Sequence, residues 1–388
     1  FAFVGLYYSY VKNDKRIFYM LFIALLTLVF YILMPEGYIW NTRFLPFYYT
    51  FSLIIAAFGL YHVIKKFNIN SSIVLPIIIA LFVFGYVNEN VTYIDDWINW
   101  NYEGFESKAN WKDLNELNIL LTSLPEGRVF HEYTNKHNLM FGTPRTLENI
   151  PYFTNKPTME GLLIESSMTS PYHFYMQSEL SETPTCPISS IRCTVFNVNN
   201  SMYHLELFNI KYIVASSEKL KQGLIDSEYS LLKNIESLGV YYTERESKYV
   251  TLPKYEPVIY SGENWQEFSM EWFKINSEVP IIYTKDNLGY KKINNLRELE
   301  ETPIENCSIN EVVKNEELII STDCIGKPLL VKISYFPNWQ VEGAKKVYIA
   351  SPSFMIIIPE QENVRLFYGP TFVDNLGAIL TLFSIIIV

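Results

Sequence analysis

The sequence of 388 residues lacks the short motifs that identify common enzyme classes. It has no Walker loop and no GxGxxG, GxSxG or HExxH pattern. It therefore carries no signature of phosphate-loop, dinucleotide-binding, serine hydrolase or zinc protease chemistry. Histidine is scarce, at five positions, and neither a CxxC nor an HxxxH pair occurs. No metal site is predicted from these residues, and no cofactor is evident.

Charge is also scarce in the first 88 residues. They contain six basic and two acidic residues, a net charge of +4. Because the whole chain has a net charge of -10, the other 300 residues have a net charge of -14. A basic apolar front and an acidic body indicate a membrane part and a soluble part, and they argue against nucleic acid as a partner. The length exceeds that of one ordinary domain, so two or three are expected.

Long apolar runs dominate this front part. Residues 17–34 (IFYMLFIALLTLVFYILM) are 18 uncharged residues, about the length that crosses a hydrocarbon core of roughly 30 Å. Residues 47–64 and 73–87 repeat the pattern, while 1–10 and 376–388 look like the end and the beginning of further spans. Buried core helices are the alternative. We expect a polytopic helical membrane region and, because both ends of the chain fall in apolar runs, an excerpt of a larger protein.

Basic residues in the short loops predict the orientation. The loops at 11–16 and 65–72 contain three and two basic residues, whereas the loop at 35–46 contains one Glu and one Arg. The positive-inside rule assigns the first two loops to the cytoplasm. We therefore predict a multi-pass protein of the cell membrane, with the lipid bilayer as a partner and residues 89–374 extracytoplasmic.

Cysteine is absent from the predicted spans and occurs only in the predicted outer segment. The four positions are Cys186, Cys193, Cys307 and Cys324. Their spacing pairs Cys186 with Cys193 and Cys307 with Cys324, as disulfides in an oxidising compartment. A zinc site is the alternative.

The outer segment begins with a pattern typical of an α/β domain. Apolar residues at helical spacing predict an amphipathic helix over 108–124. Strands are expected at 128–133, 211–215 and 239–243, and helices at 202–208 and 220–238.

After about residue 310 the pattern is that of a β-sandwich. The predicted strands are 317–322, 328–335, 346–350, 355–359 and 364–368. The predicted domains are therefore transmembrane helices at 1–88, an extracytoplasmic α/β domain at 89–305, a small β-sandwich at 306–372 and the start of a transmembrane helix at 373–388.

Several segments resemble known membrane protein families. Residues 331–343 (VKISYFPNWQVEG) and 348–359 (YIASPSFMIIIP) resemble the C-terminal module of YfhO-like membrane proteins. Residues 36–375 resemble, more specifically, integral membrane proteins labelled 6-pyruvoyl-tetrahydropterin synthase-related. The matching pieces are WNTRFLPFYY at 40–49, GTPRTLENIPYFT at 142–154, MEGLLIESSMTSPYHFYMQSEL at 159–180 and LFNIKYIVAS at 207–216.

The resemblance implies a glycosyltransferase-like protein rather than a pterin enzyme. A pterin synthase binds zinc through three histidines, and His131, His137, His173 and His204 do not show that arrangement. The resemblance places the chain near the GT-C membrane glycosyltransferases, which transfer a polyprenyl-phosphate-linked sugar on the outer face, here to an envelope glycan acceptor. Their catalytic carboxylate, and any divalent metal site, would lie in a first outer loop that the excerpt lacks. The alternative is a non-catalytic envelope protein whose outside domains bind polysaccharide or a protein partner.

Residues 159–180 contain the candidate catalytic groups. Glu160 or Glu165 is predicted as general base toward a sugar hydroxyl, with His173 polarising it or shuttling the proton. These glutamates are five residues apart and would not share a helix face, and Pro171 is expected to end any helix nearby. We therefore expect a loop across the mouth of a membrane cavity. In the alternative, Glu165 caps a helix and His173 is structural.

Other residues are candidates for substrate binding. Arg43, beside Trp40 and Asn41, is predicted to bind a lipid-linked phosphate through its bidentate guanidinium; the alternative is an interfacial anchor. Tyr172 and Tyr175 are predicted to stack on a sugar, although such tyrosines are often core residues. Glu179 is predicted as a further substrate contact.

Overall fold

The computed structural model describes residues 1–34, 41–66, 74–159, 167–186 and 193–387. They divide into two compact units, one built on Phe1–Gly104 and the other on Phe105–Cys186 and Ile191–Val388. Each unit is described by itself.

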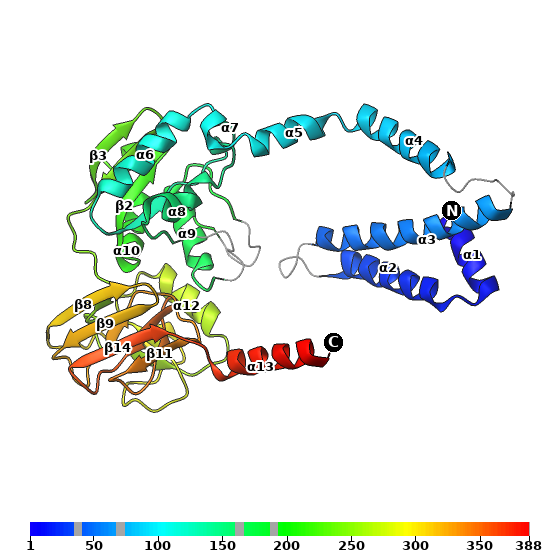
Figure 1. Ribbon diagram of the computed structural model, residues 1–388. Helices are drawn as coiled ribbons and strands as arrows, with labels where there is room; N and C mark the ends of the chain where they lie inside the picture. The colour runs from blue at the N-terminus through cyan, green and yellow to red at the C-terminus, as the bar shows by residue number, and fades with distance from the viewer. Residues whose placement is uncertain (35–40, 67–73, 160–166, 187–192, 388) are drawn as a thin grey trace. The chain divides into compact units, whose positions relative to one another are not determined.

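The first unit is helical throughout its described part (Figure 1). Its elements are α1 (Ala2–Lys12), α2 (Lys15–Leu33), the 3-10 helix η1 (Asn41–Phe44), α3 (Leu45–Lys66), α4 (Val74–Asn90) and α5 (Tyr93–Tyr102). Helix α1 contacts α3 at Gly5 and Gly59, where a Cβ on either residue would collide with the backbone of the other helix. Small residues of this kind allow helix backbones to approach closely.

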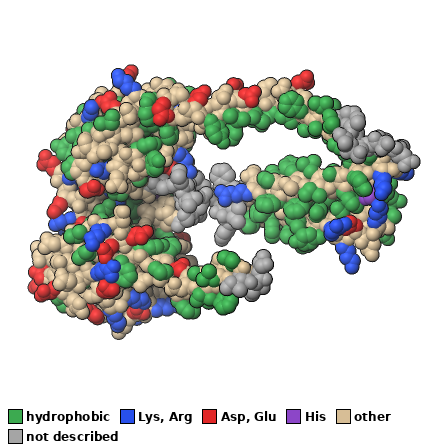
Figure 2. Space-filling view, viewed as in Figure 1, with side chains coloured by type: hydrophobic (Ala, Val, Ile, Leu, Met, Phe, Trp, Pro, Cys, Tyr) green, Lys and Arg blue, Asp and Glu red, His purple; other side chains and the backbone are tan. Residues whose placement is uncertain are grey.

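Two of these helical segments, Lys15–Leu33 and Asn41–Lys66, are long and apolar enough to cross a membrane. The first covers residues 17–33 of the span predicted at 17–34, and the second contains the span predicted at 47–64. The shorter apolar helices Ile79–Glu89, in α4, and Phe372–Ile385, in the last helix, overlap two other predicted runs, 73–87 and 376–388. Hydrophobic side chains cover the visible surface of α2 and α3 (Figure 2). Apolar surface of this extent is typical of a face that contacts lipid or another protein.

The second unit begins with a four-stranded sheet of order β1-β2-β4-β3. Its strands are β1 (Arg128–His131), β2 (Ile210–Ala215), β3 (Ser230–Ile235) and β4 (Leu238–Tyr242). Strands β1 and β2 are parallel, and the other pairs are antiparallel. Val129 packs with α6 (Trp111–Ser123), whereas Phe130 packs on the other face with α9 (Ser170–Leu180) and α10 (Val198–Leu207). This alternation follows from the pleat of a strand.

Two further sheets complete this unit within the described residues. The six-stranded sheet has the order β5-β10-β13-β12-β7-β6, and the four-stranded sheet has the order β11-β14-β9-β8. The strands are β5 (Val250–Thr251), β6 (Val258–Tyr260), β7 (Ile281–Tyr283), β8 (Ile309–Lys314), β9 (Glu317–Thr322), β10 (Leu329–Val331), β11 (Trp339–Glu342), β12 (Tyr348–Ala350), β13 (Phe354–Ile357) and β14 (Asn363–Tyr368). The remaining elements are η2 (Phe105–Ser107), α7 (His137–Phe141), η3 (Thr146–Asn149), α8 (Ile150–Thr154), α11 (Glu218–Gly223), α12 (Trp265–Lys274), η5 (Leu296–Glu298) and α13 (Phe372–Ile387).

The six-stranded sheet has a core on each face. Leu329 and Val331 pack against Leu318 and Leu366 of the four-stranded sheet. Leu330, between them, belongs to the larger core that also contains α9, α10 and α12. Because β5, β6 and β7 precede residue 306, this sheet joins strands from both sides of the predicted domain boundary.

Most predicted elements of the outer segment are present, with one clear exception. The helix predicted at 220–238 is wrong, because α11 ends at Gly223 and β3 occupies Ser230–Ile235. Strand β3 forms a tight hairpin with β4, in which Ile235 pairs with Leu238. Pairing with a buried strand therefore overrides the local helical pattern.

Candidate functional site

Helix α9 occupies the second half of the segment that holds the predicted catalytic groups. The expectation of a loop here is wrong for residues 170–180. Pro171 lies in the first turn of α9, where its missing N–H costs no helical hydrogen bond and its fixed φ favours a helix start. Ten of the 11 residues of α9 are buried, so it is a core helix. Glu160 and Glu165 lie outside the described residues.

Glu179 and His204 form a buried pair between α9 and α10. Their side chains are both 0% exposed, and Glu179 Oε2 lies 2.7 Å from His204 Nδ1. Asn200 donates to the other carboxylate oxygen, while His204 Nε2 lies 3.1 Å from the carbonyl oxygen of Phe273. The Phe273 ring stacks on the imidazole at 3.8 Å. This arrangement holds α9, α10 and α12 together, and a substrate would have to displace it to reach Glu179.

The other candidates on α9 are also in the core. Tyr172 is 3% exposed and Tyr175 is 7% exposed, and both rings pack against Phe273. His173 is 1% exposed, and its Nε2 lies 3.4 Å from the amide nitrogen of Gln177. These positions favour the structural alternative over a sugar platform or a proton shuttle in the described conformation.

Among the predicted phosphate-binding residues, Asn41 has a structural contact and Arg43 is exposed. Asn41 Nδ2 donates to the carbonyl oxygens of Tyr31 and Met34 at 3.1 and 3.2 Å, so it caps the C-terminal end of α2. The Arg43 side chain is solvent-exposed in η1. Trp40 lies outside the described residues.

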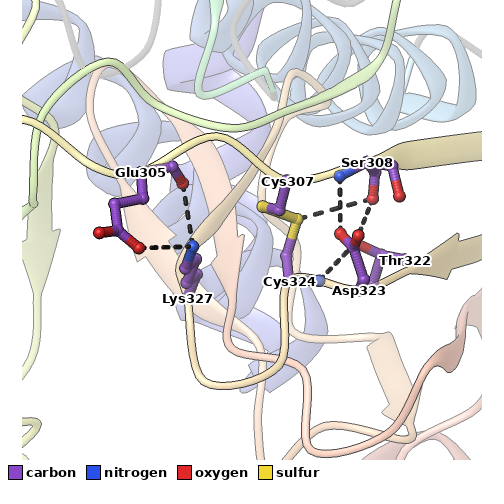
Figure 3. Close-up of a disulfide and its surroundings, with 7 residues drawn as sticks. All are labelled: Glu305, Cys307, Ser308, Thr322, Asp323, Cys324 and Lys327. Atoms are coloured by element: carbon purple, nitrogen blue, oxygen red, sulfur yellow. Dashed lines mark hydrogen bonds and ion pairs between the residues drawn. A yellow bond between two sulfur atoms is a disulfide. The ribbon is translucent and has the colours of Figure 1, made fainter.

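The four cysteines form the two predicted disulfides, Cys186–Cys193 and Cys307–Cys324. The second joins the start of β8 to the end of β9, where Asp323 accepts a hydrogen bond from the Ser308 amide at 2.6 Å (Figure 3). Asp323 lies beside the two sulfurs in a group that resembles a metal site. The sulfurs are bonded to each other and cannot act as thiolate ligands, which removes the zinc alternative for these cysteines.

A buried carboxylate that the sequence did not reveal lies at the end of β1. Glu132 is 0% exposed. Its two oxygens accept hydrogen bonds from the amides of Ser216 and Ser217, both at 2.7 Å, and from the Ser217 hydroxyl at 2.6 Å. It connects β1 to the start of α11, because Ser217 is the N-cap of that helix. With every oxygen engaged and no exposed surface, it has a structural role.

The second unit contains a cavity that is lined by none of the candidate residues discussed above. A cavity of about 150 Å³ lies between α10, the chain after β5, the end of α12 and β10. It is lined by Tyr203, Glu206, Leu207, Thr251, Leu252, Pro253, Lys254, Trp272, Ser277, Glu278, Pro280, Leu330, Lys332 and Ser351. It is smaller than the roughly 300–1,000 Å³ typical of sites for drug-sized ligands. It therefore suits one small polar group or ring.

Lys332 is the titratable group lining this cavity whose pKa is shifted toward neutral pH. Burial lowers the pKa of Lys332 to about 8; Glu206 opposes the shift, and Arg245 and Arg128 add to it. Its Nζ donates to the carbonyl oxygen of Glu206 at 3.3 Å. The Arg128 guanidinium donates a hydrogen bond to the backbone carbonyl oxygen of Lys332 at 3.1 Å.

The acidic side chains of the cavity have partners of their own. Glu206 pairs with Arg245 at 3.2 Å, and Glu278 pairs with Lys254 at 2.6 Å. The Tyr203 hydroxyl donates to the carbonyl oxygen of Ser277, and burial raises the pKa of Tyr203, so the phenol stays protonated.

A second hollow, of about 350 Å³, runs along the outer side of α6. Its lining includes Lys112, Glu116, Ile119 and Lys233, and Glu116 pairs with Lys233 at 2.7 Å. This lining is an exposed helix face with a neutralised charge pair. We therefore take the smaller cavity, with its aromatic wall and perturbed amine, as the candidate site.

One sequence signal could have indicated Lys332. It is the only charged residue in an otherwise uncharged stretch after Lys327, PLLVKISYFPNW, and a lysine within a predicted buried strand requires a partner or a cavity. Its neighbour Glu206 is 126 residues away in sequence, so only the tertiary structure brings the cavity together.

One segment of this unit is similar to a family model. Residues 123–254 match the family described as a domain of unknown function, DUF8559. No curated protein and no solved structure matches the chain. The match contains the whole first sheet and one side of the cavity, including Tyr203 and Glu206, whereas Trp272 and Lys332 lie beyond it. The resemblance to the pterin-synthase-related and YfhO-like families stays a prediction.

Proposed function

We propose that the second unit binds a glycan of the cell envelope, within a protein attached to the membrane by its apolar helices. The observation that carries this proposal is the cavity of about 150 Å³. Its wall combines aromatic and aliphatic side chains, such as Tyr203 and Leu207, with charged groups and hydroxyls. A sugar ring has an apolar face and a hydroxyl rim, and a small mixed pocket of this kind is suited to it.

The location in the envelope is supported by two independent features. Two helical segments are long and apolar enough to cross a membrane. Both disulfides lie after residue 185, and disulfides persist in oxidising, extracytoplasmic compartments. In this proposal the outer unit faces that compartment and the protein is multi-pass.

The first version of the proposal is a GT-C-like glycosyltransferase that uses a polyprenyl-phosphate-linked sugar on the outer face. The family resemblance supports it, and the exposed Arg43 in η1 is available for a phosphate contact. In this version the cavity holds the acceptor glycan. The transfer chemistry then depends on residues other than the buried Glu179, His173 and His204.

The second version is a non-catalytic envelope protein that binds polysaccharide. A specific observation favours it for the described part of the chain. Glu179 and His204 are fully buried and hydrogen-bonded to each other, and His173 is in the core. An acid or base has to come within about 2.6–3.2 Å of the reacting group, directly or through one water, and these residues are at most 1% exposed.

The two versions differ in a transfer assay. Membranes that contain the full chain are incubated with a radiolabelled polyprenyl-phosphate sugar and envelope polysaccharide, beside membranes without the protein. Label in the polysaccharide that depends on the protein supports the transferase. Binding of polysaccharide without protein-dependent label supports the non-catalytic version. Absence of both overturns the proposal.

A further inference from the structure

Lys332 has unused hydrogen-bond donors inside the candidate cavity. An ammonium group has three N–H donors, and among the described residues its Nζ has one acceptor, the Glu206 carbonyl oxygen at 3.3 Å. Lys332 lines the cavity together with Glu206. Two donors are therefore free for a ligand.

Lys332 differs from the other cationic side chains near the cavity, Lys254 and Arg245, because these two form ion pairs with glutamates. Lys254 is held by Glu278 at 2.6 Å. Arg245 is held by Glu206 at 3.2 Å and by Glu228 at 3.1 Å. Lys332 has no ion pair with the described residues, although its side chain is only partly accessible. A partly buried cation that has no counter-ion is favourably placed to bind an anionic group.

We propose that the cavity is a subsite for an acidic sugar, whose carboxylate pairs with the Lys332 ammonium. This assignment rests on the proposed glycan-binding function and specifies its ligand class. The sugar ring would lie against the aliphatic side chains of Leu207 and Leu330, which also line the cavity.

A singly charged carboxylate fits the site better than a phosphate. A phosphate monoester carries about -1.5 to -2 charges at neutral pH. The carboxylates of Glu206 and Glu278 line the same cavity, and each would repel a dianion about twice as strongly as a monoanion. One ammonium group neutralises one carboxylate.

The pH dependence of binding follows from the same group. An amine with a pKa of about 8 loses its charge on going from pH 7 to pH 9, so affinity for a carboxylate should fall about tenfold over that range. The other charged groups that face Lys332 are Glu206, Glu311, Arg128 and Arg245. Carboxyl and guanidinium groups do not ordinarily titrate between pH 7 and 9. Lys254 and Tyr203 have raised pKa values, so they keep their protons there.

The test measures sugar binding to the full chain in lipid nanodiscs by saturation-transfer NMR. The probes are D-glucuronate, its neutral counterpart D-glucose, and inorganic phosphate as a competitor. The variant Lys332→Met keeps an unbranched apolar side chain that is one atom shorter and removes the charge. Lys345→Met is the matched control, because Lys345 is an exposed lysine of the same unit.

We expect wild type and Lys345→Met to bind glucuronate in preference to glucose. Lys332→Met should bind glucuronate at least tenfold more weakly than wild type. The affinity of wild type for glucuronate should fall about tenfold from pH 7 to pH 9. Equal binding by Lys332→Met, pH-independent binding by wild type, or preferential displacement by phosphate would overturn the acidic-sugar assignment. Binding of glucose without preference for glucuronate would also overturn it, while leaving the proposed function intact. Absence of binding by every sugar and by envelope polysaccharide would overturn both.

Discussion

Replacement of Glu179 by leucine should destabilise the second unit strongly without removing a group that contacts ligand. Glu179 Oε2 lies 2.7 Å from His204 Nδ1, and both side chains are 0% exposed. The Glu179→Leu variant leaves His204 and the Asn200 amide without their acceptor. Removing one partner of a buried ion pair costs about 3–5 kcal/mol. At about 2–4 °C per kcal/mol for a domain of this size, the Tm should fall by about 6–20 °C.

A double-mutant cycle separates the pair from the packing around it. His204→Phe keeps an aromatic ring against Phe273, which stacks on the imidazole at 3.8 Å. The double variant Glu179→Leu/His204→Phe has no uncompensated charge, so its loss of stability should be smaller than the sum of the two single losses by at least about 1 kcal/mol.

The assay is thermal unfolding of the full chain in detergent, followed by calorimetry and near-ultraviolet circular dichroism. Glu271→Leu is the control, because Glu271 pairs with Lys274 at 2.6 Å but is 55% exposed, and an exposed pair is worth about 0–1 kcal/mol. Equal Tm values for Glu179→Leu and Glu271→Leu would refute the structural role. Loss of transfer or glycan binding in a Glu179→Leu protein of unchanged stability would instead make Glu179 a site residue.

Three further predictions concern other features of the second unit. Replacing Cys307 and Cys324 by serine opens a link between residues 17 apart and should cost about 3 kcal/mol, measured as a lower unfolding midpoint in urea than that of wild type. Gly343→Ala should cost about 1–3 kcal/mol, because Gly343 has a φ of +83° and a Cβ there would collide with the carbonyl oxygen of Asn363; Gly326→Ala, at a φ of +76° with open space around it, should cost less in the same measurement. After ¹³C-methylation of the lysines, one NMR signal should titrate near pH 8 and be missing from Lys332→Met. The folded pKa of Lys332, about 8, lies below the unfolded value of about 10.4, so the free energy of unfolding should rise with pH between these values. A free energy of unfolding that does not change with pH in this range would contradict the assignment.

The sequence predicted those parts of the fold in which local pattern and tertiary environment agree. Val129 and Phe130 alternate between two cores, so the strand at 128–131 was visible in the alternation of its residues. Five of the strands from Glu317 onward were predicted, and β11 (Trp339–Glu342) was missed. The two disulfides followed from cysteine spacing, because each closes a loop of 17 residues or fewer.

The failures have both local and long-range causes. Strand β3 was predicted as helix because its partner β4 supplies the hydrogen bonds that decide its conformation. The prediction that Pro171 ends a helix is wrong, because the first turn of a helix tolerates proline and Pro171 lies there in α9. The carboxylate of Glu179 is engaged in the core by His204, 25 residues away in sequence, a contact that the sequence pattern does not indicate. The cavity joins residues from 203 to 351, a distance over which no sequence pattern specifies contact.

The most direct test of the central claim is photoaffinity labelling of the full chain in native membranes with a diazirine derivative of an acidic envelope oligosaccharide. If the cavity is the glycan site, peptide mapping should find the label on segments that line it, around Tyr203, Pro253 and Lys332, and excess unlabelled oligosaccharide should remove it. Competed label confined to other segments, or the same labelling of Lys332→Met and wild type, would contradict the account.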